Sequence, residues 1–236
     1  VNSLDELWRR RIVREQGVNG YDFTHDRIRD VAYASISPAR RKLLHRRVAG
    51  ALEQAFAADL DPVSAQIASH MQLGGETRGA VAYYQRASEV ALRLFAYDAA
   101  ISLLEAALTL VRTLPASTAA VETELELQMR LCTAWSAVTS YMGKEAERAY
   151  ARTLDLCQQV QQTPHLFTVL WGLHEVALYR TDYRASVELA QQCLAIAQEL
   201  GDPGLLVEAH HAAWGPYYFM GEYDHAFAHM RAGLDL

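Results

Sequence analysis

Proline, cysteine and long apolar runs are all scarce in this 236-residue sequence. Six prolines in a chain that is 51% hydrophobic exclude a disordered protein and favour a fully folded one. No apolar run reaches the roughly 20 residues of a membrane span, and no basic-then-apolar signal segment opens the chain. We therefore expect a soluble, cytoplasmic protein that has no membrane partner.

The three cysteines, Cys132, Cys157 and Cys193, are odd in number and form no CxxC pair. Each lies in an apolar helical segment, where a free thiol behaves as a small hydrophobic side chain. We predict that all three are buried structural thiols and not redox or metal groups.

Motifs of common catalytic sites are also missing. The phosphate-binding pattern GxxxxGK[ST] is absent, because Gly143-Lys144 is followed by Glu145 and lacks the upstream glycine. The patterns GxSxG, HExxH and GxGxxG are absent as well. We predict that this chain is not an enzyme, has no catalytic residues and holds no cofactor of its own.

Histidines gather near the end of the sequence. His225 and His229 are four residues apart on a predicted helix, close in sequence to His210 and His211, and this spacing lets two imidazoles share a metal ion. A metal-dependent hydrolase would also need a third ligand and a matching glutamate motif. We therefore favour surface or groove histidines over a metal site.

Charge is distributed unevenly along the chain. Residues 1–50 carry a balance of +5 and residues 51–236 a balance of −11. The acidic part argues against nucleic acid as a direct ligand, because attraction to phosphates supplies most non-specific affinity. The arginines near the start leave a DNA-binding winged helix as an alternative, although residues 1–37 are too short for a complete one.

A repeat of helical periodicity runs through the rest of the sequence. A turn residue is followed by small or apolar residues at +3, +4, +7, +10 and +11, which lie on one face of a helix. Copies begin at Tyr97, Gly143, Tyr183 and Tyr223, at steps of 46, 40 and 40 residues, and Glu147 interrupts the second copy. This period indicates two helices per unit and about nine helices in the array.

A second helix precedes each copy, with paired positions nine and six residues upstream. These positions are Ser88 and Ala91, Ala134 and Ala137, His174 and Ala177, and Trp214 and Tyr217. The cadence of the two helices resembles the tetratricopeptide repeat (TPR), and its longer period resembles the sensor repeats of the bacterial maltose-regulon activator family. The resemblance implies an all-α, TPR-like superhelix of helix pairs, an α-solenoid, over residues 38–236.

The segment from Gly20 to Glu53 carries a further resemblance. Its run FTHDRIRDVAY, followed by RR and LHRRVA, resembles the end of the winged helix in bacterial signal-transduction ATPases with numerous domains. The resemblance makes residues 1–37 the C-terminal part of a winged-helix-like element. It also implies an upstream nucleotide-binding domain that binds ADP or ATP in the parent protein. A short strand pair is expected around residues 11–13 and 21–23.

The dipeptide His25-Asp26 is similar to the Met-His-Asp motif of plant disease-resistance proteins, although Thr24 stands in place of the methionine. The resemblance implies that His25 and Asp26 sense nucleotide phosphates in the parent protein. An ordinary structural role is the alternative: Thr24 would cap the following helix, and Asp26 would be a solvated charge in its first turn.

Aromatic residues concentrate in the last third of the chain, where Tyr and Trp could line the groove of a superhelix. Gly215-Pro216 is expected to break the helix there and so to mark the ligand site. Our groove candidates are His174, Tyr179, Trp214, Tyr217 and Tyr218. Packing between helices is the alternative role for each of these residues.

The leading hypothesis from the sequence is a non-catalytic sensor of a protein or small-molecule signal, within a signalling ATPase that regulates transcription. A constitutive TPR scaffold for protein assembly is the alternative. Because the chain starts at Val1 and ends within a repeat copy, we expect it to be part of a longer protein.

Overall fold

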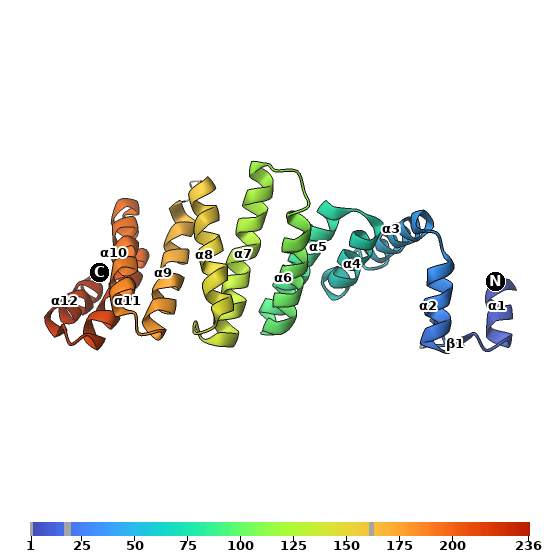
Figure 1. The fold of residues 1–236 in the computed structure, drawn as a ribbon, viewed down its shortest axis with the longest axis horizontal. Coiled ribbons are helices and arrows are strands. Elements are labelled where there is room, and N and C mark those ends of the chain that lie inside the picture. Colours follow the sequence, from blue (N-terminus) through green and yellow to red (C-terminus); the bar gives the residue numbers. More distant parts are fainter. Residues whose placement is uncertain (1, 17–19, 161–162) are drawn as a thin grey trace.

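A row of helices forms most of the chain in the computed structural model, which describes residues 2–16, 20–160 and 163–236. Each helix packs mainly on the helices before and after it, so the row is extended and not closed into a ball (Figure 1). Ten array helices lie in the described residues, where about nine were predicted. They are α3 (Pro38–Ala55), α4 (Ser64–Gly74), α5 (Thr77–Arg93), α6 (Tyr97–Val111), α7 (Thr118–Thr139), α8 (Lys144–Val160), α9 (Thr163–Tyr179), α10 (Tyr183–Leu200), α11 (Pro203–Phe219) and α12 (Tyr223–Leu234), with a 3₁₀ turn η1 (Asp61–Val63) before α4.

The described residues 2–16 and 20–35 form a separate small element at one end of the row (Figure 1). It consists of α1 (Asn2–Arg9), β1 (Val13–Glu15), β2 (Tyr21–Phe23) and α2 (Asp26–Ser35). The strands pair antiparallel, with Val13 opposite Phe23. The second strand lies where it was predicted. The first strand begins at Val13, two residues later than predicted.

The predicted repeat register is that of the structure. Its copies begin at α6, α8, α10 and α12, which we call the B helices; the helices before them, α5, α7, α9 and α11, are the A helices. In α6 all five of the predicted stripe positions after Tyr97 are buried, including Leu104 at 0% exposure. Glu147, the charged residue in the α8 copy, forms an ion pair at 2.6 Å with Arg180, which directly follows α9, and this explains its place in the stripe.

Helix ends follow the turn chemistry of the sequence. The Ser37 side chain accepts a hydrogen bond from the Arg40 backbone N–H, and Pro38 occupies the first turn of α3, where its missing N–H has no cost. Gly75 ends α4 with φ +78°, a left-handed conformation that glycine adopts without strain.

The same left-handed position recurs in every A–B turn, two residues before the repeat copy begins. Its occupants are Phe95, Tyr141, Thr181 and Gly221, with φ between 57° and 79°. Only the last is a glycine. Phe95 is also 76% exposed, so at this turn a bulky side chain holds a strained backbone without being buried.

Replacing Phe95 with glycine is expected to raise the free energy of unfolding by about 0.5–1 kcal/mol. Glycine adopts a positive φ without strain, and this gain in free energy exceeds the cost of the greater conformational entropy that glycine gives the unfolded chain. Urea denaturation of Phe95→Gly and Phe95→Ala tests this, because alanine keeps the Cβ atom and the strain. Equal decreases in the free energy of unfolding of both variants would contradict the prediction. They would show that the edge contact between the Phe95 and Tyr97 rings, at 6.3 Å between centroids, contributes more than the backbone strain.

The predicted helix break at Gly215-Pro216 is wrong. Helix α11 continues through Pro216 to Phe219, and Pro216 is fully buried. Within a helix, the ring of a proline normally clashes with the Cβ atom of the residue before it, but Gly215 has no Cβ. Pro216 also lies in the last turn of α11, so it removes one hydrogen bond near the end of the helix only.

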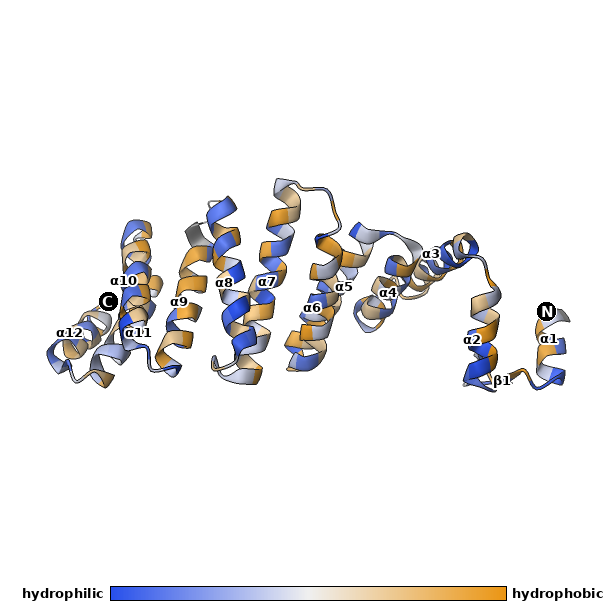
Figure 2. Cartoon of the chain, viewed as in Figure 1, coloured by the Kyte–Doolittle hydropathy of each residue, from blue (hydrophilic) through white to orange (hydrophobic). Residues whose placement is uncertain are grey.

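Apolar side chains from neighbouring helices form the core, and apolar and polar residues alternate along the array helices (Figure 2). One cluster of buried residues extends from α3 to α9, and smaller clusters link α9, α10 and α11. Helix α9 belongs to both parts. At its centre, Gly172 lies against the ring of Tyr150 from α8.

Candidate ligand groove

Cavities recur between successive A helices. The one between α5 and α7 has a volume of about 380 Å³, the one between α7 and α9 about 170 Å³, and the one between α9 and α11 about 260 Å³. All three lie between successive A helices, so they form a discontinuous groove along these helices. We call this the A-helix groove.

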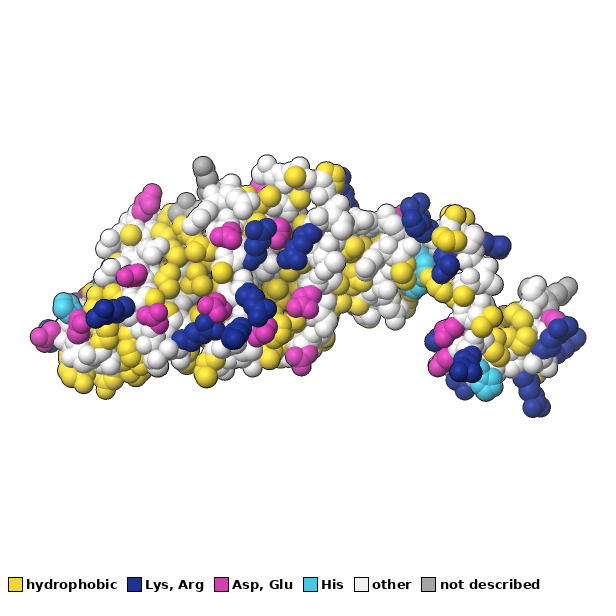
Figure 3. Space-filling view, viewed as in Figure 1, with side chains coloured by type: hydrophobic (Ala, Val, Ile, Leu, Met, Phe, Trp, Pro, Cys, Tyr) yellow, Lys and Arg dark blue, Asp and Glu magenta, His cyan; other side chains and the backbone are white. Residues whose placement is uncertain are grey.

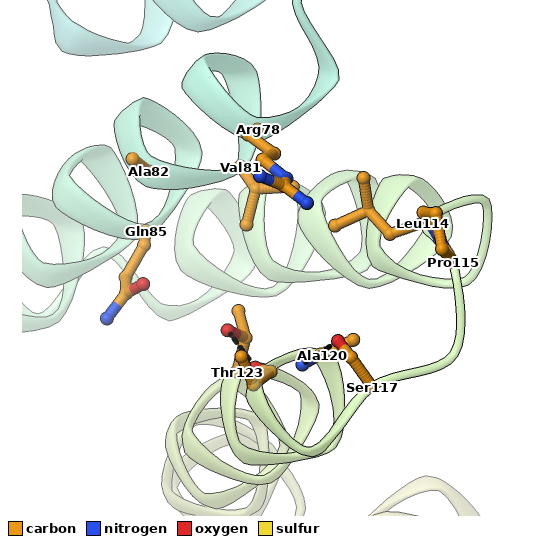
Figure 4. Close-up of a pocket in the computed structure, with 10 residues that line it drawn as sticks. Arg78, Val81, Ala82, Gln85, Leu114, Pro115, Ser117, Ala120 and Thr123 are labelled. Carbon is orange, nitrogen blue, oxygen red and sulfur yellow. Dashed lines mark hydrogen bonds between the residues drawn. The ribbon is translucent and has the colours of Figure 1, made fainter.

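The cavity between α5 and α7 is the widest section of the A-helix groove. Figure 4 shows Arg78 and Val81 of α5 facing the first turns of α7, with Leu114 and Pro115 closing one side. The Ser117 side chain is engaged in capping α7. Arg78 forms no ion pair with any residue that the structure describes, so its guanidinium is available to an acidic group in the cavity.

Side chains of α5 and α7 meet beside the next cavity. Arg130 binds Glu89 of α5 at 2.8 Å and lies 3.7 Å from Glu126 of its own helix. The Gln85 amide donates to Glu126 at 3.2 Å. This network fixes the spacing of two A helices and places both signs of charge at the groove. The sequence analysis did not identify these residues, whose partners are 41 residues apart.

Between α9 and α11 the groove is aromatic and acidic. Trp171 lines the cavity, and its buried Nε1 has no hydrogen-bond partner among the described residues. One turn later, the side chain of Glu175 is 14% exposed, and burial raises the pKa of this carboxyl, opposed by the positive charge of nearby His211. His211 in turn lies 6.2 Å from Trp214 between ring centroids. Glu208 lines the same cavity as Trp171, so an unpaired indole N–H and a carboxylate are offered to one ligand with both acceptor and donor groups.

His174, a predicted groove residue, lies in the interior. It is 1% exposed, and its Nδ1 is 2.8 Å from the Ser186 hydroxyl and 3.2 Å from the Ser186 carbonyl oxygen of α10. Burial lowers the pKa of this imidazole. In this structure His174 therefore joins α9 to α10 behind the groove surface.

The other four candidates divide between two places. Trp214 lines a separate cavity between α11 and α12, together with His211 and His229, and the Tyr218 ring lies 6.2 Å from it between ring centroids. Tyr217 packs against α12, where it stacks on His225 at 5.1 Å and on His229 at 5.7 Å.

Tyr179 lies at the end of α9. It is 52% exposed and stacks on Tyr141 with an interplanar angle of 1°. The five candidates thus do not form one site, because sequence spacing does not show which side of a helix faces the groove.

The histidines of α11 and α12 pair with one another. His210 Nδ1 lies 3.0 Å from His229 Nδ1, and His225 lies 3.1 Å from Glu222. Among the described residues, no group of three or more His, Cys, Asp or Glu side chains could hold a metal ion. The three cysteines are buried as predicted, and burial raises the pKa of each thiol.

His25 and Asp26 are both exposed at the start of α2. His25 is the residue before the helix and makes no side-chain capping bond. The alternative role of Thr24 as the cap of α2 is wrong: its hydroxyl donates to the Arg11 carbonyl at 2.7 Å and so ties the start of α2 to the turn after α1. Asp26 forms an ion pair with Arg29 at 3.2 Å.

Lowering the pH from about 7.5 to about 5.5 is expected to lower the melting temperature. Burial holds the pKa of His174 below 6.5, so below that pH the unfolded chain gains a proton that the folded chain refuses. The pKa values of His70 and His229 are also lowered by burial and act in the same direction. Melting curves of wild type and His174→Gln across this range test the prediction, and an unchanged slope in the variant would contradict it.

Comparison with known proteins identifies the fold class. No protein-family model matches the sequence. TPR-like repeats of a kinesin light chain from Podospora anserina superpose with a TM-score of 0.61 at 18% identity, covering 84% of this chain and 94% of theirs. The protein BtubC of P. vanneervenii superposes with a TM-score of 0.57 at 17% identity, covering 85% and 91%. The chain is a TPR-like α-solenoid.

The solenoid is also similar to part of larger proteins. A signal-transduction ATPase with numerous domains from Pyrococcus horikoshii, which carries a TPR sensor, superposes with a TM-score of 0.51 at 16% identity, over 98% of this chain and 39% of that one. In sequence, an uncharacterised protein of Rhizobium meliloti is 23% identical over 228 residues, 95% of this chain. The chain spans 22% of the length of that relative. Among the described residues, no helix is both long and apolar enough to cross a membrane.

Proposed function

We propose that this solenoid is the non-catalytic sensor module of a multidomain signalling ATPase and that its A-helix groove binds the signal. The row of three cavities between successive A helices carries the proposal. The signal is a protein or a small molecule. A row of cavities favours an extended segment of a protein, because successive side chains can enter successive cavities.

The chemistry of the groove suggests which segment it accepts. Arg78 at one end offers a positive charge, and Glu208 at the other end offers a negative one. Trp171 supplies rigid apolar area at the α11 end. We expect a segment that carries an acidic residue toward α5 and a basic or aromatic residue toward α11.

Selection of random peptides on the immobilised solenoid tests the groove. Peptides recovered from the selection are expected to bind Trp171→Ala and Glu208→Gln at least about tenfold more weakly than wild type. Trp8→Ala is the matched control, because Trp8 is 55% exposed and belongs to α1, outside the array. Peptides that bind wild type and both groove variants equally would contradict groove binding.

We further propose that residues 1–37 adjoin an upstream nucleotide-binding domain of the same protein. That domain binds ADP or ATP as its cofactor, and His25 and Asp26 lie near the nucleotide phosphates. The exposure of both side chains supports access to such a partner. A hydrogen-bonded chain also leads from this element into the array: the Tyr33 hydroxyl is 2.9 Å from His45 Nε2, and His45 Nδ1 is 2.8 Å from His70 Nδ1. These residues link α2, α3 and α4. In this proposal the parent protein is cytoplasmic and regulates transcription, and this chain makes no direct contact with nucleic acid.

Thermal unfolding of the full-length parent protein tests this second part. ADP is expected to raise the melting temperature, and His25→Ala is expected to remove much of that rise. If ADP has no effect while peptides still bind the groove, the solenoid is a constitutive scaffold and not part of a switch.

A further inference from the structure

A fourth cavity lies on the other side of α7 from the A-helix groove. It is enclosed by α6, α7 and α8 and has a volume of about 380 Å³, within the range of small-molecule sites. Gln128, Leu131 and Trp135 line it from one face of α7, whereas Thr123 and Arg130 of the same helix line the groove. A ligand could therefore occupy this cavity and the groove at the same time.

Charges of both signs border the fourth cavity without being paired. Arg112 and Arg148 form no ion pair within the described part of the chain, and the same holds for Glu105 and Glu145, which line the same space. Basic and acidic side chains are interspersed over the middle of the molecule in Figure 3. Unpaired groups of both signs around one cavity suit a ligand that carries a carboxylate and an ammonium group.

Two further side chains shape the interior of this cavity. Arg152 is held by Glu124 through two hydrogen bonds of 3.0 and 3.1 Å, so its position is fixed. Gln128 is only 4% exposed, and its Oε1 has no donor among the described residues. A buried acceptor without a donor is unfavourable, and an N–H group of a ligand would satisfy it. Trp135 and Leu131 offer apolar contact beside it.

We propose that the cavity between α6, α7 and α8 binds an unblocked dipeptide with an apolar side chain. The dipeptide carboxylate binds Arg112 and Arg148, and its ammonium group binds Glu105 and Glu145. Its amide N–H donates to Gln128 Oε1, and its apolar side chain packs on Trp135. This site does not depend on the function proposed for the groove.

Isothermal titration calorimetry of the solenoid with glycyl-L-leucine and glycyl-L-phenylalanine tests the proposal. At least one of the two is expected to bind, while its N-acetylated, C-amidated form does not. Arg148→Gln is expected to weaken binding at least about tenfold, because it removes a charged partner. Arg78→Gln is the matched control, since it removes an equally exposed arginine that lines the groove instead.

Gln128→Leu separates a ligand role from a purely structural one. The substitution removes the unpaired acceptor, so the melting temperature is expected to rise while dipeptide affinity falls. A rise in melting temperature with unchanged affinity would overturn the role of Gln128 in binding. Absence of binding by both dipeptides, or equal binding of inorganic phosphate, would overturn the dipeptide site.

Discussion

Gly172→Ala is expected to destabilise the solenoid by about 3 kcal/mol, a large effect for one methyl group. A Cβ atom at this position would lie 2.0 Å from Cε1 and 2.3 Å from Cζ of Tyr150. The ring cannot easily move aside, because Tyr150 is 7% exposed and its hydroxyl lies 3.1 Å from the Ser136 hydroxyl. Helices α8 and α9 would have to separate instead.

Guanidinium denaturation monitored by circular dichroism measures this effect. Gly50→Ala is the matched control: Gly50 lies within α3 with nothing within 4 Å of its would-be Cβ, so alanine should stabilise by about 0.5–1 kcal/mol. In the double variant Gly172→Ala with Tyr150→Leu, the loss should be smaller than the sum of the two single losses. A change below about 0.5 kcal/mol for Gly172→Ala would show that the two helices adjust freely.

Leu104→Ala is expected to cost about 3–4 kcal/mol. The side chain is 0% exposed in α6, and its truncation removes apolar burial and leaves a cavity in the larger core cluster. Because each array helix packs mainly on its neighbours, the effect should remain local. Hydrogen exchange is expected to accelerate in α5, α6 and α7 and to change little in α11 and α12.

Leu94→Ala provides the control for this second prediction. Leu94 is 72% exposed at the end of α5, so its truncation should change the free energy of unfolding by less than about 0.5 kcal/mol. Exchange that accelerates equally along the whole array in Leu104→Ala would indicate a single cooperative unit and contradict local unfolding.

The helical repeat could be predicted from the sequence because burial leaves a periodic record. Positions such as Leu104, Ala190 and Ala226 are small or apolar because a neighbouring helix covers them, and all three are buried. Turn positions were equally readable where Pro38, Gly75 and Gly201 fix the backbone. These signals are local or repeat at a fixed spacing, so one sequence suffices to detect them.

The candidate site was less predictable, because it depends on which helix faces meet. His174 and Trp214 occupy equivalent repeat positions, yet one is buried against Ser186 and the other lines a cavity between α11 and α12. The Gly215-Pro216 pair is typical of a helix break, yet α11 continues because Gly215 has no Cβ for the proline ring to clash with. Gly172, a glycine inside a strongly helical segment, was the one available hint of a close helix contact.

The close approach of Gly172 to Tyr150 also has a mechanical meaning. Helix α9 joins the larger core cluster to the smaller ones, and α8 and α9 share the least extensive contact of any two consecutive helices from α3 to α12. A rotation of one part of the array relative to the other would therefore occur at this contact. A small rotation of α9 against the Tyr150 ring would displace α12 over a much larger distance, so a change between two helices would alter the position of the far end of the array.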